Sequence, residues 1–341
     1  MYLICYGTRP EYIKLAPLIN IFSEKRMVFK TLFSGQHATL LDVVAANPDI
    51  VLSDIMEHGQ SLNALVSKIL TQMDRVFETE TFTSVIVQGD TSTSFAIAFA
   101  AFQRKINIIH VEAGLRTGNK YSPFPEEVNR LMISRIADVH FCPTARSVNN
   151  LLIENIHESV FNVGNTVVDA YHQIIKTTTP NENLKNILEL PFILVTLHRR
   201  ENRGNKMESI WQQLNQLSSL YSFVYITHPS IPNAKDTLSS KISCIPPQDY
   251  IDMVHLISKC QGIITDSGGI QEEATCAGKR VLVCRDTTER PETIECGLGL
   301  LVDTRVIENI DFLNKPVLDI MNPFGNDVCN KIAEILLKLN I

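Results

Sequence analysis

Residues 106–130 read INIIHVEAGLRTGNKYSPFPEEVNR, and this stretch contains the unit from which the chain is built. The apolar run from Ile106 to Val111 predicts a buried strand, and Glu112 follows it directly. A loop rich in Gly and Pro then leads to Glu126, where the spacing of apolar residues becomes helical. Ligands of open α/β sheets bind at the carboxyl ends of the strands, so Glu112 and Glu126 are both predicted to lie at a binding edge.

Strands and helices alternate in the same way along the first half of the chain. Short apolar runs predict strands at Tyr2–Tyr6, Phe29–Ser34, Ser84–Gln88, Ile106–Val111, Val139–Cys142 and Val160–Val163. Apolar residues spaced three or four apart predict helices at Glu11–Phe22, Ser61–Thr79, Thr93–Arg104 and Glu126–Ile136. Repeated alternation of this kind is typical of a parallel sheet with helices on both faces.

The pattern starts again after a polar segment at residues 177–187. The strands of this second series are predicted at Phe192–Thr196, Phe223–Thr227, Gly262–Thr265 and Arg280–Cys284. Its helices are predicted at Lys206–Ser218, Ile251–Lys259 and Ile270–Ala277. A chain of 341 residues is also long for a single core. We therefore expect an α/β protein with two Rossmann-like, doubly wound parallel-sheet domains that face one another across a cleft.

The crossover between the two domains is expected near Gly164-Asn165-Thr166. The last stretch, Phe324–Asn340, has the spacing of a helix that returns to pack on the first domain. The first domain is then formed by residues 1–166 plus 324–341, and the second by residues 167–323.

Composition and charge exclude several classes of protein. A net charge of −6 argues against a dedicated nucleic-acid binder, and no apolar stretch approaches the length of a membrane span. The N-terminus reads as a strand that enters a turn, not as a secretion signal, so a cytoplasmic location is expected. The eight cysteines have no CxxC spacing and are expected to be reduced core thiols, not zinc ligands.

Three carboxylates are the candidates for acid–base chemistry. Glu112 and Glu126 flank one loop, and Asp90 follows the predicted strand Ser84–Gln88. Paired carboxylates held on loops are typical of general acid–base catalysis. The alternative is structural, because Asp90 and Glu126 both stand at helix starts, where carboxylates act as caps or favour the helix dipole.

The segment Gly7-Thr8-Arg9-Pro10-Glu11 follows the first strand and is a candidate phosphate site. A glycine turn feeds a helix whose first N–H groups are free to bind an anion, and Arg9 can bind a phosphate in two places. Lys14 follows about one helical turn later. A plain turn with surface charges is the alternative. Neither GxGxxG nor GxxxxGK[ST] occurs, so no nicotinamide dinucleotide or ATP is indicated.

Two motifs of the second half also favour anions. His198-Arg199-Arg200 follows a predicted strand, and a histidine next to two arginines suits an anion better than a metal. Ser267-Gly268-Gly269 lies between a strand and a helix, where backbone N–H groups could hold a diphosphate. Glu273, expected in the first turn of that helix, could reach ribose hydroxyls. Helix capping alone is the alternative.

A third motif, residues 285–292, is dense in charge and begins where a strand ends. Arg285 and Arg290 suit a ligand phosphate, or they pair with neighbouring acids.

The motifs occur in a fixed order from residue 7 to about residue 302: GTRPE, GQH, GDT, HVEAGLRTG…SPFPEEVNR, GNT, HRREN, TDSGGIQEEA and DTTERPE. In this order they resemble the non-hydrolysing UDP-N-acetylglucosamine 2-epimerase family of bacterial type. The resemblance implies a GT-B-like pair of domains, a homodimer and no cofactor. It also implies interconversion of UDP-N-acetylglucosamine (UDP-GlcNAc) and UDP-N-acetylmannosamine (UDP-ManNAc), which supplies activated ManNAc for surface polysaccharides.

The family is understood to expel UDP, form a 2-acetamidoglucal and add UDP back with inversion at carbon 2. Carried over by motif, the resemblance assigns catalytic roles to Asp90, Glu112, Glu126 and His198. It assigns substrate or UDP binding to Arg9, Lys14, Arg130, Ser267, Gly268, Gly269, Glu273 and Arg290.

Regulated members of the family bind a second UDP-GlcNAc beside the active site. The candidate residues for such a regulatory site here are Gln36, His37, Arg199 and His228. Thr39 and Gly59 stand where those members have a glutamine and an arginine, and His228-Pro229-Ser230 also departs from the family pattern. Activation by substrate is therefore left open.

Three other readings remain. A sibling 2-epimerase would act on a UDP-2,3-diacetamido uronic acid. A GT-B glycosyltransferase with a UDP-sugar donor would give the carboxylates at 112 and 126 no clear task. A non-catalytic sensor of nucleotide sugars would not need three acids around the sugar.

Overall fold

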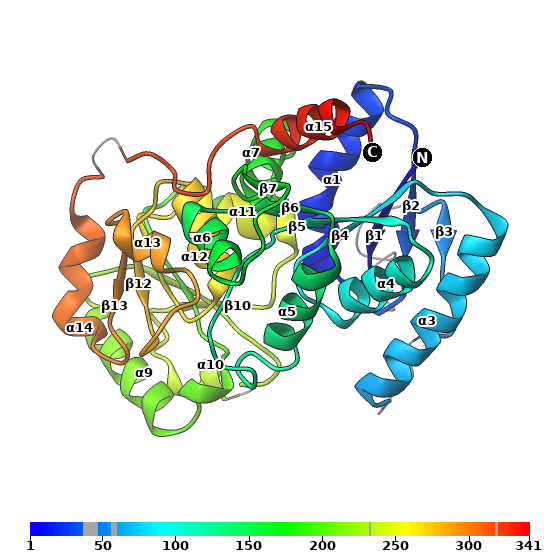
Figure 1. Cartoon of the computed structure of the whole chain (residues 1–341). Coiled ribbons are helices and arrows are strands. Elements are labelled where there is room, and N and C mark those ends of the chain that lie inside the picture. The colour runs from blue at the N-terminus through cyan, green and yellow to red at the C-terminus, as the bar shows by residue number, and fades with distance from the viewer. Residues whose placement is uncertain (37–46, 56–59, 232, 318–319) are drawn as a thin grey trace. The chain divides into compact units, whose positions relative to one another are not determined.

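The computed structural model describes residues 1–36, 47–55, 60–231, 233–317 and 320–341 (Figure 1). The chain divides into two compact units. Unit 1 comprises Met1–Ala170 and Gly325–Ile341, and unit 2 comprises Tyr171–Phe324. The chain leaves unit 1 inside helix α7 (Val167–Thr177), which directly follows the turn at Gly164-Asn165-Thr166.

Unit 1 is built on a seven-stranded parallel sheet in the order β3-β2-β1-β4-β5-β6-β7. The strands are β1 Tyr2–Tyr6, β2 Phe29–Phe33, β3 Ile50–Val51, β4 Ser84–Gln88, β5 Asn107–Val111, β6 Val139–Cys142 and β7 Val160–Asn162. The chain winds to one side of β1 and then to the other, so the topological switch lies between β1 and β4. The loops that leave β1 and β4 therefore open at the position where such sheets bind ligands.

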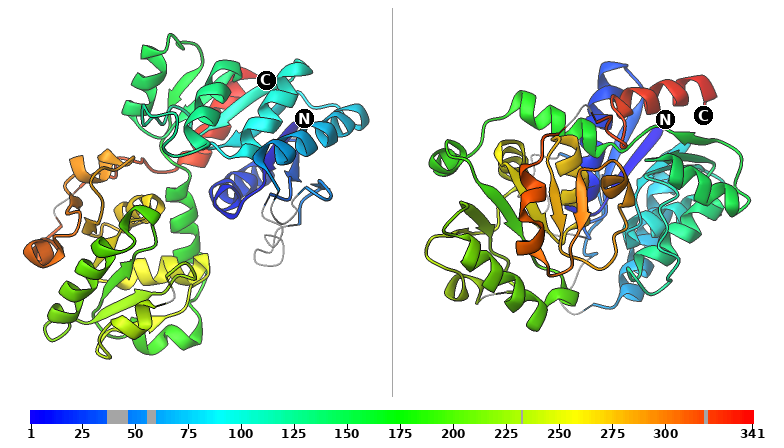
Figure 2. Two further views of the ribbon diagram at one scale, coloured as in Figure 1. Left: turned by 90° about the horizontal axis from the view of Figure 1, so that it is seen from below. Right: turned by 90° about the vertical axis from the view of Figure 1, so that its left-hand side faces the viewer.

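Helices cover both faces of this sheet. They are α1 Arg9–Glu24, α3 Leu62–Thr79, α4 Ser92–Gln103, α5 Glu126–Ile136, α6 Ala145–Ile153 and α15 Val328–Leu339. One core lies under α1 and α15 and contains Leu18, Phe22 and Ile332, all fully buried. The other core lies under α3 and α4 and contains Ile69 and Ile97. Helix α15 lies beside α1 (Figure 1; Figure 2, right), so the end of the chain completes the unit in which it began.

Unit 2 has a six-stranded parallel sheet in the order β10-β9-β8-β11-β12-β13, which repeats the winding of the first six strands of unit 1. Its strands are β8 Ile193–Thr196, β9 Phe223–Ile226, β10 Ser243–Ile245, β11 Gly262–Thr265, β12 Val281–Val283 and β13 Gly299–Leu301. The longer helices are α9 Asn205–Leu217, α11 Tyr250–Lys259 and α12 Gly268–Cys276. Short helices are α8 Lys185–Leu188, α10 Ala234–Thr237, α13 Pro291–Glu295 and α14 Val306–Asn309. The switch point lies between β8 and β11.

The expected fold class, two parallel-sheet α/β domains, is confirmed. Most predicted elements are present within a few residues of their expected ends, because the apolar spacing on which they rested marks real burial. The sequence did not predict β3, β10 and β13, which are two or three residues long and form sheet edges. Strands this short bury too few side chains to leave a recognisable apolar run.

In the part of the chain that the structure describes, no helix is both long and apolar enough to cross a membrane.

Candidate active site

The first group of candidate residues lies at the carboxyl edge of the unit 1 sheet. Glu112 comes directly after β5, in a left-handed backbone conformation with φ of 65°, and its side chain is largely buried. Its Oε2 accepts hydrogen bonds from Lys14 Nζ at 2.5 Å and from Gln88 Nε2 at 2.8 Å. Lys14 comes from α1 and Gln88 from the end of β4, so the two strands at the switch point and their helices fix this carboxylate together.

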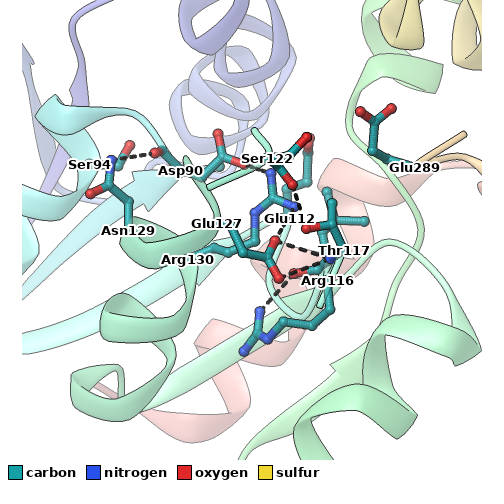
Figure 3. Close-up of polar contacts among 12 residues, drawn as sticks. Asp90, Ser94, Glu112, Arg116, Thr117, Ser122, Glu127, Asn129, Arg130 and Glu289 are labelled. Atoms are coloured by element: carbon teal, nitrogen blue, oxygen red, sulfur yellow. Dashed lines mark hydrogen bonds and ion pairs between the residues drawn. The ribbon is translucent and has the colours of Figure 1, made fainter. Parts of the chain in front are cut away.

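Asp90 is held by the neighbouring helix α5 (Figure 3). Its side chain forms an ion pair with Arg130, and its main-chain carbonyl accepts a hydrogen bond from Asn129 Nδ2 at 2.9 Å. Arg130 also donates from Nη1 to Glu127 Oε2 at 3.2 Å. Arg130, which the family resemblance assigned to substrate binding, therefore pairs with two carboxylates within unit 1.

Glu126 and Glu127 are adjacent at the start of α5, yet their surroundings differ. Glu127 is buried and accepts hydrogen bonds from the main-chain N–H groups of Thr117, at 3.0 Å, and Gly118, at 2.9 Å (Figure 3). The half-buried Glu126 carboxylate makes no hydrogen bond or ion pair with any residue that the structure describes. Glu127 thus shapes the loop, and Glu126 is the acid of the pair that remains available.

Two buried residues that the sequence did not single out support the Asp90 turn. His110, on β5, is fully buried, and its Nε2 is 2.7 Å from the carbonyl oxygen of Gly89. A carbonyl only accepts, so Nε2 carries the proton and donates it. Burial lowers the pKa of His110 to about 3, which keeps the ring neutral. Glu11, the other residue, accepts hydrogen bonds from Thr91 and Ser94 on the far side of the turn.

The remaining unit 1 candidates lie at helix starts. Arg9 is the first residue of α1, and Pro10 follows it, as is common in the first turn. Gln36 Oε1 accepts hydrogen bonds from the Thr93 N–H at 3.1 Å and the Thr93 hydroxyl at 2.7 Å. His37, Thr39 and Gly59 lie outside the described residues.

The second group belongs to unit 2 and is organised by a residue that the sequence did not single out. Asp266 comes directly after β11 and is fully buried. Its carboxylate accepts hydrogen bonds from the main-chain N–H groups of His198 at 3.1 Å and Arg199 at 2.9 Å, and from Asn202 Nδ2 at 3.0 Å. Asp266 therefore shapes the loop after β8. A buried acid is hard to recognise in sequence, because only its partners show that its charge is satisfied.

His198 and His228 lie against one another in this unit. Their rings stack with centroids 5.1 Å apart and planes inclined by 24°. Burial lowers the pKa of His198, although the charge of Asp266 acts in the opposite direction. Nδ1 of His228 accepts a hydrogen bond from the Ser230 N–H at 3.2 Å, so its proton is on Nε2. The lowered pKa favours the neutral form of the His198 ring.

Helix α12 begins directly after Asp266 and Ser267, with a start that suits an anion. Ser267 is its N-cap, and within the described residues its hydroxyl caps no N–H of the helix. Gly268 and Gly269 form the first two helical positions. A Cβ at Gly269 would have no heavy atom within 4 Å, and one at Gly268 would lie 3.8 Å from Arg199 Nη2. Free N–H groups, the positive end of the helix dipole and a guanidinium therefore lie together.

The charged motif at residues 285–292 is tied together by ion pairs. Arg285 binds Glu289 through two nitrogens, at 2.5 and 3.1 Å, and Glu201 at 3.0 Å. Burial alone would raise the pKa of Glu289, but the guanidinium groups of Arg285 and Arg199 outweigh it and hold that pKa at about 2. Arg290 donates from Nε to Glu272 at 2.5 Å. The arginines of this motif pair with neighbouring acids, the alternative left open from sequence.

One expectation for unit 2 is wrong. Glu273 was expected in the first turn of its helix, but α12 begins at Gly268, two residues earlier than predicted, and Glu273 lies in its second turn. The reason is that Ser267 takes the N-cap position and the two glycines are helical. Burial raises the pKa of Tyr250 well above its usual value, and the charge of the nearby Glu273 acts in the same direction.

Within the described ranges, no group of three or more His, Cys, Asp or Glu side chains is placed to hold a metal ion.

Comparison with known proteins identifies the family. The family model described as UDP-N-acetylglucosamine 2-epimerase matches residues 20–337. UDP-N-acetylglucosamine 2-epimerase of Bacillus subtilis (strain 168) is 39% identical over 357 residues, with 97% of this chain and 93% of that protein covered.

Two solved structures are similar over nearly the whole chain. UDP-GlcNAc 2-epimerase from Neisseria meningitidis, bound to UDP-GlcNAc, has 38% identity and a TM-score of 0.85, with 99% of each chain covered. The Methanocaldococcus jannaschii enzyme, in complex with UDP-GlcNAc and UDP, has 33% identity and a TM-score of 0.84, with 99% of this chain and 100% of that chain covered. The chain belongs to the UDP-N-acetylglucosamine 2-epimerase family.

Proposed function

We propose that the chain interconverts UDP-GlcNAc and UDP-ManNAc by elimination and re-addition of UDP. The observation that carries this proposal is the arrangement of three carboxylates at one sheet edge of unit 1. Glu112 is held by Lys14 and Gln88, Asp90 is held by Arg130, and Glu126 is without a partner among the described residues. A reaction that removes a proton from one face of carbon 2 and returns one to the other face needs several acids, each differently held.

In the proposed reaction, one carboxylate takes the proton from carbon 2 while the bond between carbon 1 and the UDP oxygen breaks. The electron pair of the C–H bond forms the double bond of 2-acetamidoglucal, and UDP leaves with the electrons of the C–O bond. A second carboxylate then protonates carbon 2 on the opposite face, and UDP returns to carbon 1. Glu112, Glu126 and Asp90 are the groups that we propose for these two transfers, with Lys14 keeping positive charge beside Glu112.

Unit 2 supplies the groups that we propose for the nucleotide. UDP departs with negative charge, and groups aimed at developing charge favour its departure. The start of α12, with Ser267, Gly268 and Gly269, is proposed to bind the diphosphate together with Arg199. His198 is proposed to donate a hydrogen bond to the same phosphates from a neutral ring, since burial lowers its pKa.

The proposal extends to the other residues that the resemblance assigned. Arg9 and Lys14 are proposed to contact the same polar substrate groups, and Glu273 the ribose. Arg290 keeps its assignment to UDP binding, although here it is also paired with Glu272. Relatives in this family have been solved with UDP-GlcNAc and with UDP, which supports the choice of ligand.

The identity of the sugar is tested by incubating the protein with UDP-GlcNAc in deuterated water and following the anomeric and carbon 2 protons by NMR. The expected result is UDP-ManNAc with deuterium at carbon 2, without added NAD or metal. Retention of the original proton would exclude the mechanism. Inert UDP-GlcNAc beside a reactive UDP-2,3-diacetamido uronic acid would keep the mechanism and change the substrate. Transfer of the sugar to an acceptor would indicate a glycosyltransferase.

The proposal also includes a homodimer that works in the cytoplasm and supplies ManNAc units for surface polysaccharides. Family resemblance is its support. Light scattering of the eluting protein during gel filtration tests the dimer, with a mass of twice 38.3 kDa expected. A single-chain mass at micromolar concentration would contradict it.

Regulation by a second UDP-GlcNAc is a separate question for this chain. Gln36 is engaged with Thr93, and the His228 ring stacks on His198, so two of the four candidate regulatory residues already have partners within their own units. We propose that any activation by substrate is weak. Initial rates against UDP-GlcNAc concentration test this, with a hyperbolic curve expected and a sigmoidal curve contradicting it.

A further inference from the structure

Glu11 is a buried carboxylate that accepts hydrogen bonds from four donors. It is 1% exposed. Its Oε2 accepts from the main-chain N–H groups of Gly7 at 2.9 Å and Thr8 at 2.7 Å. Its Oε1 accepts from the hydroxyls of Thr91 at 2.5 Å and Ser94 at 2.7 Å. One side chain thus joins two segments that are distant in sequence, since Thr91 and Ser94 lie 80 and 83 residues after Glu11.

The position of Glu11 explains how a carboxylate is tolerated there. It is the third residue of α1, where it completes a capping box with Thr8. Its other partners, Thr91 and Ser94, are the N-cap and the third residue of α4. The carboxylate therefore lies at the positive ends of two helices at once, which favours negative charge. Burial raises its pKa, and the hydrogen bonds from Thr91, Gly7 and Ser94 act in the opposite direction.

The two segments that Glu11 joins, the turn after β1 and the start of α4, are closely packed against one another. A Cβ at Gly7 would lie 2.2 Å from both Ser34 Oγ and Thr93 Oγ1, so the β1 turn is in contact with the start of α4. The Ser94 hydroxyl is also 2.6 Å from the carbonyl oxygen of Gln88, so its single proton is shared between that carbonyl and Glu11. A shift of either segment therefore moves the other, together with the residues that each one carries.

These segments carry proposed site residues on both sides of Glu11. Arg9 follows Thr8, and Asp90 precedes Thr91. Gln88, which binds Glu112, precedes the same turn. We propose that Glu11 is a positioning residue that fixes the Arg9 and Asp90 turns relative to one another at the switch point of unit 1. This inference rests on the proposed function, since it names what sets the geometry of that same site.

The decisive variants are Glu11→Ala and Glu11→Gln. Alanine leaves two N–H groups and two hydroxyls without their shared acceptor. Glutamine can still hydrogen-bond to both segments. Its amide oxygen accepts from the N–H groups of Gly7 and Thr8, and its NH2 group donates to the hydroxyl oxygens of Thr91 and Ser94, whose protons then point elsewhere. The proton of Ser94 already has a second acceptor in the Gln88 carbonyl. Displacement of a reacting group by about 1 Å costs about 100-fold in rate.

We expect Glu11→Ala to lower kcat by about 100-fold and Glu11→Gln by less than about 10-fold, both measured as deuterium incorporation at carbon 2. Hydrogen exchange followed by mass spectrometry should show faster exchange in Glu11→Ala at residues 7–14 and 88–95, with α15 unchanged. Asp169→Ala is the matched control, because Asp169 also accepts from two helix N–H groups, those of Val328 at 3.2 Å and Cys329 at 2.6 Å. It should speed exchange at the start of α15 and leave kcat unchanged.

Two results would overturn the inference. One is a Glu11→Ala protein with kcat within about threefold of wild type. The other is faster exchange throughout unit 1, equal in the Gln and Ala variants, which would make Glu11 a general stability residue. If Glu11→Ala cannot be purified, Ser94→Ala replaces it, because it removes the hydroxyl between Glu11 and Gln88 and leaves the Glu11 carboxylate in place. Its expected loss of kcat is about 10-fold, and no loss would count against the inference. Wild type that leaves UDP-GlcNAc unchanged refutes the proposed function, whereas the exchange pattern still tests whether Glu11 joins the two turns.

Discussion

The two sheets have the same strand order, but different kinds of polar group lie at the carboxyl ends of their strands. In unit 1, side chains of opposite charge hold the carboxylates, as Lys14 holds Glu112 and Arg130 holds Asp90. In unit 2, the corresponding groups are backbone N–H groups at the start of α12 and the stacked rings of His198 and His228. Proton transfer requires a group at a fixed place, which several partners provide. Binding of a diphosphate requires spread positive potential, which a helix start provides.

The largest expected effect tests the proton-transfer side of this comparison. Glu112→Gln should lower turnover by about 100-fold or more while UDP binding is retained, because the amide keeps its hydrogen bonds but cannot carry the proton. Deuterium incorporation at carbon 2 measures the first quantity, and calorimetric titration with UDP measures the second. Loss of UDP affinity together with activity would assign Glu112 a structural role.

The adjacent acids Glu126 and Glu127 give a matched pair. Glu126→Gln should also lower turnover by about 100-fold, with no change in the free energy of unfolding. Glu127→Gln should destabilise the protein by about 2 kcal/mol, because it weakens buried hydrogen bonds to Thr117, Gly118 and Arg130. Urea unfolding and deuterium incorporation, measured on both variants, separate the two effects. Equal stability loss in both variants would remove the distinction drawn here.

Buried His110 gives a prediction on pH. Its pKa is lowered by burial to about 3 in the folded chain, and it is about 6.5 in the unfolded chain. Between these values only the unfolded chain binds the proton, so the stability contributed by the neutral ring is present above about pH 6.5 and is lost as the pH falls. His110→Asn should therefore flatten the fall of the unfolding free energy between pH 6.5 and 4 by about 1.4 kcal/mol per pH unit. Parallel curves for wild type and variant, from urea titrations at each pH, would contradict this.

The smallest expected effect tests the anion-binding side. Ser267→Ala should weaken UDP binding by about fivefold, equivalent to about 1 kcal/mol, since it removes one hydroxyl and leaves the helix N–H groups in place. Gly269→Ala is the companion variant, because a Cβ there would meet no protein atom within 4 Å. A Cβ that enters the space of the ligand would weaken UDP binding without changing stability in its absence. Unchanged affinity in both variants, measured by calorimetry, would move the diphosphate away from α12.

Sequence predicted the fold well where apolar spacing decides it. The strand Ser84–Gln88 and the helix Glu126–Ile136 have their predicted bounds, because one depends on a continuous apolar run and the other on a clear helical start. The family resemblance is confirmed. The roles of Asp90, Glu112, Glu126 and His198 stay predictions.

The residues that hold the site loops in place could not be predicted from sequence, for a physical reason. Glu11, Glu127 and Asp266 are buried acids that all accept hydrogen bonds from main-chain N–H groups, and nearly every residue has such a donor. One signal was available: Thr8 and Glu11 have the spacing of a capping box. That Glu11 of this box also contacts the start of α4 follows only from the strand order, which places β1 beside β4.

The shared winding of the two sheets has an evolutionary consequence. Two halves with one strand order, each with its loops at the same edge, are what duplication of an ancestral half would leave. Such halves can then diverge separately, because substitutions in one leave the core of the other intact. Under the proposed division of roles, substitutions in the loops after β4 and β5 could change the sugar specificity, while the nucleotide-binding residues of unit 2 stay the same.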